Sequence, residues 1–148
     1  MRFNISLGMT PVEEFDVEAL VGCIELNGAK EFFRAPTSYW GRSQYYGSWI
    51  ESIEQGVARG GQSVLVTSMT DPSFANFLTV WVLYYVGDLV YVQNSMIFLD
   101  EIEGGFDLCK IDSYVGSREQ FDEDGNKISE WVVPLEDVVN CLARLKTE

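Results

Sequence analysis

Apolar residues recur along this chain with two different periods, and each period predicts its own kind of element. Residues 19–26 are mostly apolar, residues 29–35 return the chain, and Asn27 and Gly28 stand between them. Both turn residues tolerate a positive φ angle, so these residues predict a β-hairpin.

The next segment carries the spacing of a helix. Its apolar residues fall three, four, seven and eleven positions after the first, which lines one helical face: Tyr46, Trp49, Ile50, Ile53 and Val57. Gly60 and Gly61 are expected to end this helix, because glycine readily takes the left-handed conformation at a helix terminus. Residues 63–69 then predict a strand, and residues 70–73 a turn.

Residues 77–99 predict a hairpin at the centre of the fold. Gly87 and Asp88 form a two-residue turn with glycine first. Both faces of this hairpin are apolar, so we expect it to be covered on both sides and Trp81 to be buried. The turn fixes the cross-strand pairs: Val86 with Leu89, Tyr84 with Tyr91, Val82 with Gln93, and Trp81 with Asn94.

The rest of the chain predicts smaller elements: a short helix at 107–114, a turn at 122–126 and a strand at 127–133. Apolar residues at helical spacing from Leu135 to Leu145 predict a C-terminal helix, with Pro134 tolerated at its start. Together these elements predict an α+β fold with a single domain over residues 1–148. In it, twisted antiparallel β-sheets pack with a mid-chain helix and a C-terminal helix.

Charge narrows the range of functions. The 148 residues include 23 acidic residues, 10 basic residues and no histidine, which gives a net charge of −13. Phosphate-rich partners are repelled by such a charge, so it argues against binding to nucleic acid or to an anionic membrane and favours a basic protein partner. Without histidine, the chain lacks the commonest general base and the usual zinc ligands.

The cysteines and the N-terminal residues predict the compartment. Cys23, Cys109 and Cys141 are widely spaced and form no metal-binding or redox pair. We expect reduced thiols that pack as small apolar side chains, as in a reducing compartment. The N-terminal residues lack the sustained apolar core of a signal peptide. The sequence therefore predicts a soluble, cytoplasmic protein.

No catalytic motif stands out. Neither a dinucleotide-binding nor a phosphate-binding glycine motif occurs. Asp122, Asp124 and Asn126 begin with the spacing of a calcium loop, but Lys127 and Val133 occupy the positions that need glycine and glutamate. A hairpin turn explains the same residues. The residues alone thus predict an acidic binding protein that is not an enzyme and holds no metal or cofactor.

Several aromatic and apolar segments follow one another in an order that resembles a known family. They are Ser38-Tyr39-Trp40, Tyr46-Gly47-Ser48-Trp49, Trp81-Val82-Leu83-Tyr84-Tyr85, Val90-Tyr91-Val92-Gln93-Asn94, Ile97-Phe98-Leu99 and Ile128-Ser129-Glu130-Trp131. The pattern resembles the CdiI-type immunity proteins of bacterial contact-dependent growth inhibition systems, over residues 36–99 and 127–145. This resemblance implies an architecture similar to the Whirly fold, without its basic nucleic-acid surface.

The resemblance also implies a function. Such an immunity protein binds and neutralises the C-terminal toxin domain of its cognate CdiA effector in the producing cell. The toxins of these systems are often nucleases, whose clefts are basic, and a partner with a charge of −13 suits them because opposite fields speed association. No small-molecule substrate is implied.

The predicted toxin contact lies in the acidic part of the chain that departs from the family pattern. Solvated loops often have the same composition, and the N-terminal acidic run from Glu13 to Glu18 is the next candidate. The predicted contact residues are Asp100, Glu101, Glu103, Asp107, Glu119, Asp122, Glu123 and Asp124.

Two other functions remain open on the sequence alone. One is a small acidic adaptor domain unrelated to toxins, whose gene need not follow a long effector gene. The other is an enzyme that uses two carboxylates, which requires acidic side chains converging in a pocket.

Overall fold

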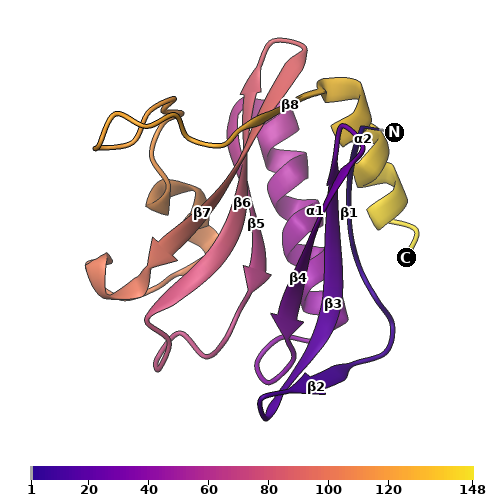
Figure 1. The fold of residues 1–148 in the computed structure, drawn as a ribbon, viewed down its shortest axis with the longest axis vertical. Helices are drawn as coiled ribbons and strands as arrows, with labels where there is room; N and C mark the ends of the chain where they lie inside the picture. Colours follow the sequence, from indigo (N-terminus) through magenta and orange to yellow (C-terminus); the bar gives the residue numbers. More distant parts are fainter. Residues whose placement is uncertain (1) are drawn as a thin grey trace.

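The computed structural model describes residues 2–148, which form two antiparallel sheets with helices behind and beside them (Figure 1). The first sheet has four strands: β1 (Phe3–Leu7), β2 (Val12–Glu14), β3 (Val17–Leu26) and β4 (Ala29–Pro36). The long strand β3 lies at its centre, because β1 and β2 pair with one edge of β3 and β4 pairs with the other.

The second sheet also has four strands, in the order in which the chain forms them. They are β5 (Gly61–Ser68), β6 (Phe77–Val86), β7 (Leu89–Phe98) and β8 (Trp131–Pro134). The last strand is short and pairs with β7 only from Leu89 to Val92. The rest of β7 therefore has no neighbouring strand on that side among residues 2–148.

Two α-helices complete the predicted α+β fold. The helix α1 (Arg42–Arg59) connects the two sheets and lies behind the gap between them, and α2 (Leu135–Leu145) lies along β1 (Figure 1). Arg144 fastens α2 to β1, because its guanidinium donates hydrogen bonds to Asn4 Oδ1 at 2.8 Å and to the carbonyl of Ile5 at 2.6 Å. Two short 3₁₀ helices, η1 (Leu99–Glu101) and η2 (Leu108–Tyr114), follow β7.

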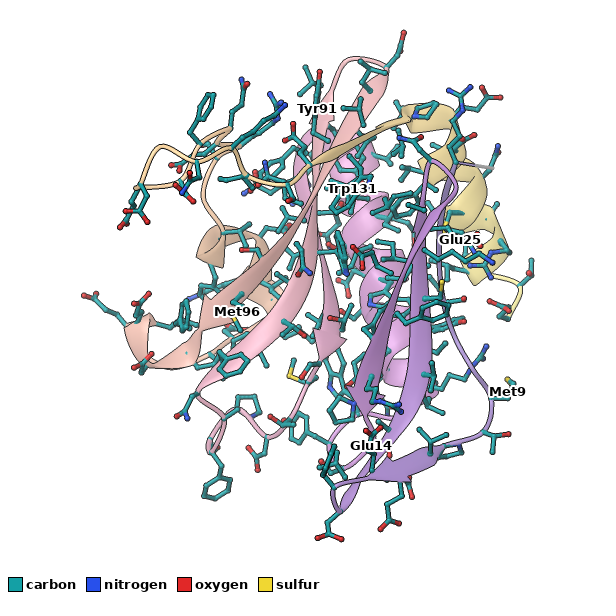
Figure 2. The ribbon with its side chains drawn as sticks, in the orientation of Figure 1. Met9, Glu14, Glu25, Tyr91, Met96 and Trp131 are labelled. Atoms are coloured by element: carbon teal, nitrogen blue, oxygen red, sulfur yellow. The ribbon has the colours of Figure 1, made fainter. Side chains whose placement is uncertain are left out.

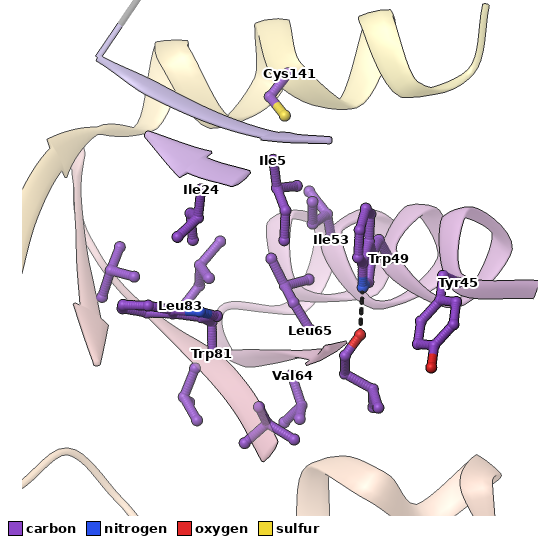
Figure 3. Close-up of a cluster of buried hydrophobic side chains, with 14 of the residues drawn as sticks. Ile5, Ile24, Tyr45, Trp49, Ile53, Val64, Leu65, Trp81, Leu83 and Cys141 are labelled. Atoms are coloured by element: carbon purple, nitrogen blue, oxygen red, sulfur yellow. Dashed lines mark hydrogen bonds between the residues drawn. The ribbon is translucent and has the colours of Figure 1, made fainter. Parts of the chain in front are cut away.

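One hydrophobic cluster includes side chains from both sheets and both α-helices (Figure 3). Trp49 on α1 is completely buried in it, and its Nε1–H donates a hydrogen bond to the carbonyl of Val66 at 2.8 Å. The hydroxyl of Tyr45 donates to the carbonyl of Pro36 at 2.8 Å and accepts from the N–H of Met69 at 3.0 Å. Burial raises the pKa of Tyr45 to about 12, so this hydroxyl remains a donor at neutral pH.

The structure confirms both predicted hairpins and the mid-chain helix. Asn27 and Gly28 have φ angles of 54° and 88°, as the predicted turn requires. Trp81 is buried, with 4% of its surface exposed. The predicted cross-strand pairs of the central hairpin are also those observed: Val86 with Leu89, Tyr84 with Tyr91, Val82 with Gln93, and Trp81 with Asn94.

Other element predictions need correction. The strands β1 and β2 were not predicted, although Phe3, Ile5 and Leu7 alternate with polar residues and are all buried. The strand predicted over 127–133 begins only at Trp131, because the preceding residues continue the loop that returns from Phe121.

The predicted burial is wrong at three places. Phe77 and Met96 are 43% and 45% exposed, because the twisted strands carry this end of β6 and β7 away from the first sheet (Figure 1). Val57, predicted on the buried face of α1, is also exposed, and Gly56 packs against the sheet instead. Of the three thiols expected to pack as apolar groups, that of Cys109 is exposed.

Gly56 allows α1 to approach the second sheet closely. A Cβ atom at this position would collide with the Oγ of Ser63 and the ring of Tyr85, and both groups are fixed because their hydroxyls hydrogen-bond each other at 2.9 Å. We expect Gly56→Ala to lower the free energy of unfolding by about 1–3 kcal/mol, measured by urea denaturation.

Gly47 on the same helix is the matched control for this substitution. Apart from its chain neighbours and the backbone of the helix itself, no atom lies within 4 Å of the position that its Cβ would take. Gly47→Ala is therefore expected to stabilise the protein by about 0.5–1 kcal/mol, because alanine favours the helix. Equal effects of the two substitutions would contradict the close packing at Gly56.

Candidate partner-binding surface

The segment between β7 and β8, residues 99–130, crosses one face of the second sheet. Its backbone carbonyls accept hydrogen bonds from a polar side chain on each of β5, β6 and β7, which fixes its path. These bonds run from Gln62 Nε2 to Asp112 and Val115 at 3.2 Å, from Tyr84 Oη to Gly116 at 3.3 Å, and from Gln93 Nε2 to Glu119 at 2.9 Å.

The predicted contact residues, from Asp100 to Asp124, are all exposed. They form two groups: a first acidic segment, residues 100–107, directly after β7, and a second acidic segment, residues 119–124, in the loop before β8. Figure 1 shows both on the β7 side of the molecule, at different heights. No hydrogen bond or ion pair within the described part of the chain joins them. They are two separate clusters on one side.

Two of these carboxylates have a local structural role. Asp107 Oδ1 accepts a hydrogen bond from the N–H of Cys109 at 3.0 Å, and Asp122 Oδ1 accepts from the N–H groups of Asp124 and Asn126 at 2.9 Å. Asp residues commonly close turns in this way. The calcium-like spacing at Asp122 thus produces a turn, as the sequence indicated.

The first acidic segment also borders a cavity of about 580 Å³. Its lining includes Glu103 and Asp107, the aromatic residues Tyr39 and Trp40, and Lys110. The cavity combines acidic groups with aromatic surface. Such a combination can accept the charged end and the apolar stem of a basic side chain.

A cluster of charged and aromatic side chains anchors the second acidic segment to β7. Arg118 donates two hydrogen bonds to Glu130, at 2.8 and 2.6 Å, and its guanidinium carbon lies 3.8 Å from the ring centre of Tyr91. Glu130 also accepts from Gln93 Nε2 at 2.7 Å. The hydrogen bonds from Arg118 hold the pKa of Glu130 below its ordinary value of 4.5.

We expect Glu130→Gln to lower the free energy of unfolding by about 1–2 kcal/mol at pH 7, because it removes charge-assisted bonds at a side chain that is 11% exposed. The pKa of Glu130 is lower in the folded state than in the unfolded chain, where it is 4.5. The stabilisation by the ionised carboxylate is therefore complete above pH 4.5 and is lost as the pH falls through the pKa of the folded state. The difference from the original chain should therefore shrink towards pH 3 in urea denaturation. Glu123→Gln, in the exposed loop, should change stability by less than about 0.5 kcal/mol at either pH.

Sequence reasoning missed this anchoring cluster. Gln93 was a signal, because a polar side chain inside an apolar hairpin needs partners, but the partners come from residues 26 and 37 positions away. Sequence reasoning also placed Phe77 and Met96 in the core, whereas they are part of the surface.

Among residues 2–148, no helix has both the length and the hydropathy needed to cross a membrane.

Three comparisons with known proteins point to the same family. Residues 35–141 match the family described as the CdiI N-terminal domain. The protein named Immunity protein CdiI, from Enterobacter cloacae subsp. cloacae, is 40% identical over 117 residues, which cover 79% of this chain and 80% of that protein. A chain in the structure titled "CdiA-CT/CdiI toxin and immunity complex from Enterobacter cloacae" aligns with a TM-score of 0.92 at 36% identity, covering 99% of each chain.

Proposed function

This chain belongs to the CdiI family, and from that membership we propose that it is an immunity protein that binds the C-terminal toxin domain of its cognate CdiA effector. Binding blocks the toxin inside the cell that produces it. One observation carries the proposal: the likeness to a chain of a toxin and immunity complex extends over 99% of both chains at a TM-score of 0.92. The shared part therefore includes nearly all of residues 2–35 and 101–126, where the sequence pattern had indicated no resemblance.

The proposal extends to the chemistry of the partner. The net charge of −13 favours a basic toxin surface, and a nuclease that holds phosphates has such a surface. The protein acts by binding, in the cytoplasm, without catalysis, cofactor, metal, nucleic acid, membrane or small-molecule substrate. The described residues share one hydrophobic cluster, which supports a single immunity-protein domain over residues 1–148.

We place the toxin contact on the two acidic segments, residues 100–107 and 119–124. Their side chains are exposed, they lie on one side of the molecule, and the segment that carries them is held in place by Gln62, Gln93 and Arg118. A preformed acidic surface loses little conformational entropy on binding, which favours affinity. The cavity beside Glu103 supplies a place for one basic side chain of the toxin.

A protection assay tests the proposed function. The C-terminal toxin domain of the cognate CdiA effector is expressed in a susceptible bacterium, with and without the chain. We expect growth arrest without the chain, full growth with it, and a stable complex of the two purified proteins in size-exclusion chromatography. The toxin domain of an unrelated contact-dependent inhibition system is the control, and this chain should neither bind it nor protect against it. Growth arrest in the presence of the folded chain would refute the proposal.

A further inference from the structure

One edge of the second sheet is left without a partner strand. The strand β8 covers β7 only from Leu89 to Val92, whereas β7 continues to Phe98. Residues 94–98 pair with β6 on one side and with no strand on the other among residues 2–148. Natural proteins usually shield such an edge with a lysine, a proline, a bulge or a covering loop, because it can pair with another chain. This stretch of β7 contains neither lysine nor proline.

The register shows which backbone groups point outward at this edge. Leu89 pairs with Val86 across the two-residue turn, so the backbone N–H and C=O of Leu89 bond to β6. Backbone groups alternate in direction along an antiparallel strand, so every second residue after Leu89 also bonds to β6. Two observations agree: Leu89 faces Pro134, which has no N–H to offer, and the N–H of Leu99 bonds back towards β6, to the carbonyl of Asn76 at 2.9 Å. The remaining set faces away from β6: Asn94, Met96 and Phe98.

These three residues have no hydrogen-bond partner on their outer side. Within residues 2–148, no backbone or side-chain group bonds to the outward N–H or C=O of Asn94, Met96 or Phe98. Their side chains are exposed, and Figure 2 shows Met96 at this rim of the sheet. Backbone groups of this kind are satisfied by water in the free protein and can form a ladder with an added strand.

Apolar and acidic side chains surround the same edge. The rings of Phe77 and Phe98 lie 6.5 Å apart on one face, and 43% and 48% of their surfaces are exposed. A hollow of about 360 Å³ adjoins the edge and is lined by Met96 and Phe98 together with Glu101 and Glu103. The first acidic segment begins where the strand ends, and the second is bonded to Gln93 at the start of the free stretch.

We propose that the free edge of β7, residues 94–98, receives an extended segment of the toxin domain as an added strand, with basic side chains directed to Glu101 and Glu103. The inference rests on the proposed function and adds the mode of recognition. Backbone hydrogen bonds to Asn94, Met96 and Phe98 fix the register of the added strand. The exposed aromatic pair covers its apolar side chains, and the acidic segments at both ends select a basic sequence.

Residue-resolved hydrogen exchange of the complex tests this inference. The free chain and its complex with the catalytically inactivated cognate toxin domain are compared by NMR. We expect the amides of Asn94, Met96 and Phe98 to exchange about tenfold or more slowly in the complex. The amides of Ser95 and Ile97 already bond to β6 and should be slow in both samples. Slowing confined to the three outward amides is the result expected for strand addition, and the comparison of variants at Met96 tests the backbone hydrogen bond itself.

A pair of variants at one position tests the same point by affinity. Met96→Ala removes the side chain and keeps the outward N–H, whereas Met96→Pro also removes the N–H without breaking a bond to β6. We expect Met96→Pro to bind the toxin domain at least about tenfold more weakly than Met96→Ala, with both folds checked by circular dichroism. If the proline variant does not fold, the exchange experiment on the original chain still decides the question.

Each outcome has a distinct meaning. A toxin complex that forms while the three outward amides keep their fast exchange overturns the strand addition and leaves the proposed function intact. Protection of these amides in the free chain, together with a dimeric mass, also overturns it, because a second copy then occupies the edge. Absence of any complex with the cognate toxin domain refutes the proposed function itself.

Discussion

Trp49→Ala is expected to lower the free energy of unfolding by about 3–5 kcal/mol, which is the usual cost of removing a buried large aromatic side chain. The indole is completely buried, and its ring centre lies 5.2 Å from that of Tyr46 and 6.3 Å from that of Phe33. Alanine leaves a cavity between α1 and both sheets and also leaves the carbonyl of Val66 without its donor. Urea denaturation of the two proteins measures the difference.

Two variants separate the causes of this effect. Trp49→Phe keeps an aromatic ring but removes the hydrogen bond to Val66, so we expect a smaller loss of about 1–3 kcal/mol. Phe74→Ala, at a side chain that is 87% exposed, should change stability by less than about 0.5 kcal/mol. A loss below about 1 kcal/mol for Trp49→Ala would mean that the helix does not pack on β5 through this ring.

Reversal of charge on the acidic segments is expected to slow association with the toxin domain by about tenfold or more at low salt. The substitutions to lysine are best made at carboxylates that close no turn, so that the loop keeps its shape: Asp100, Glu101, Glu119 and Glu123. The effect should shrink as salt rises, because the screening length falls from about 30 Å at 0.01 M to about 8 Å at 0.15 M. Stopped-flow mixing at several salt concentrations measures it.

The control makes the same change in net charge elsewhere on the surface. It replaces four other exposed acidic residues with lysine: Glu13, Asp16, Glu31 and Glu51. We expect less than about threefold slowing, because these positions lie outside the proposed contact. Equal slowing by both variants would show that only the net charge matters. Greater slowing by the control would place the contact outside the two acidic segments.

Much of the fold could be predicted because local chemistry determines it. The turn Asn27-Gly28 and the turn Gly87-Asp88 each admit one tight geometry, and the register of the flanking strands follows from it. The helix from Arg42 to Arg59 follows from apolar spacing and a terminal glycine. In these cases, residues close in sequence carry the whole signal.

The rest depends on contacts between distant residues. The strand β1 is five residues long and finds its partner β3 about fifteen residues later, without a tight turn to signal it. The exposed end of the central hairpin is as apolar in sequence as the buried part. Only the twist of the sheet determines which of these residues the first sheet covers. The second acidic segment is anchored by an ion pair between Arg118 and Glu130. The loop between these two residues has no periodic pattern of apolar residues that would predict the pairing. The sequence divides the acidic residues into a stretch and a turn, but it does not show that the two lie apart in space on one side of the molecule.

The hydrogen bond between Arg144 on α2 and Asn4 on β1 has a consequence for the timing of protection. These residues are 140 positions apart in the sequence. The hydrogen bond between them can therefore form only after the ribosome has synthesised nearly the whole chain. At the usual pace of bacterial translation, about 5–20 residues per second, that interval is roughly 7–30 s. A cell that begins synthesis only when a toxin arrives has no closed fold during this time. Under the proposed function, survival would depend on a stock of finished molecules, which predicts constant expression rather than induction.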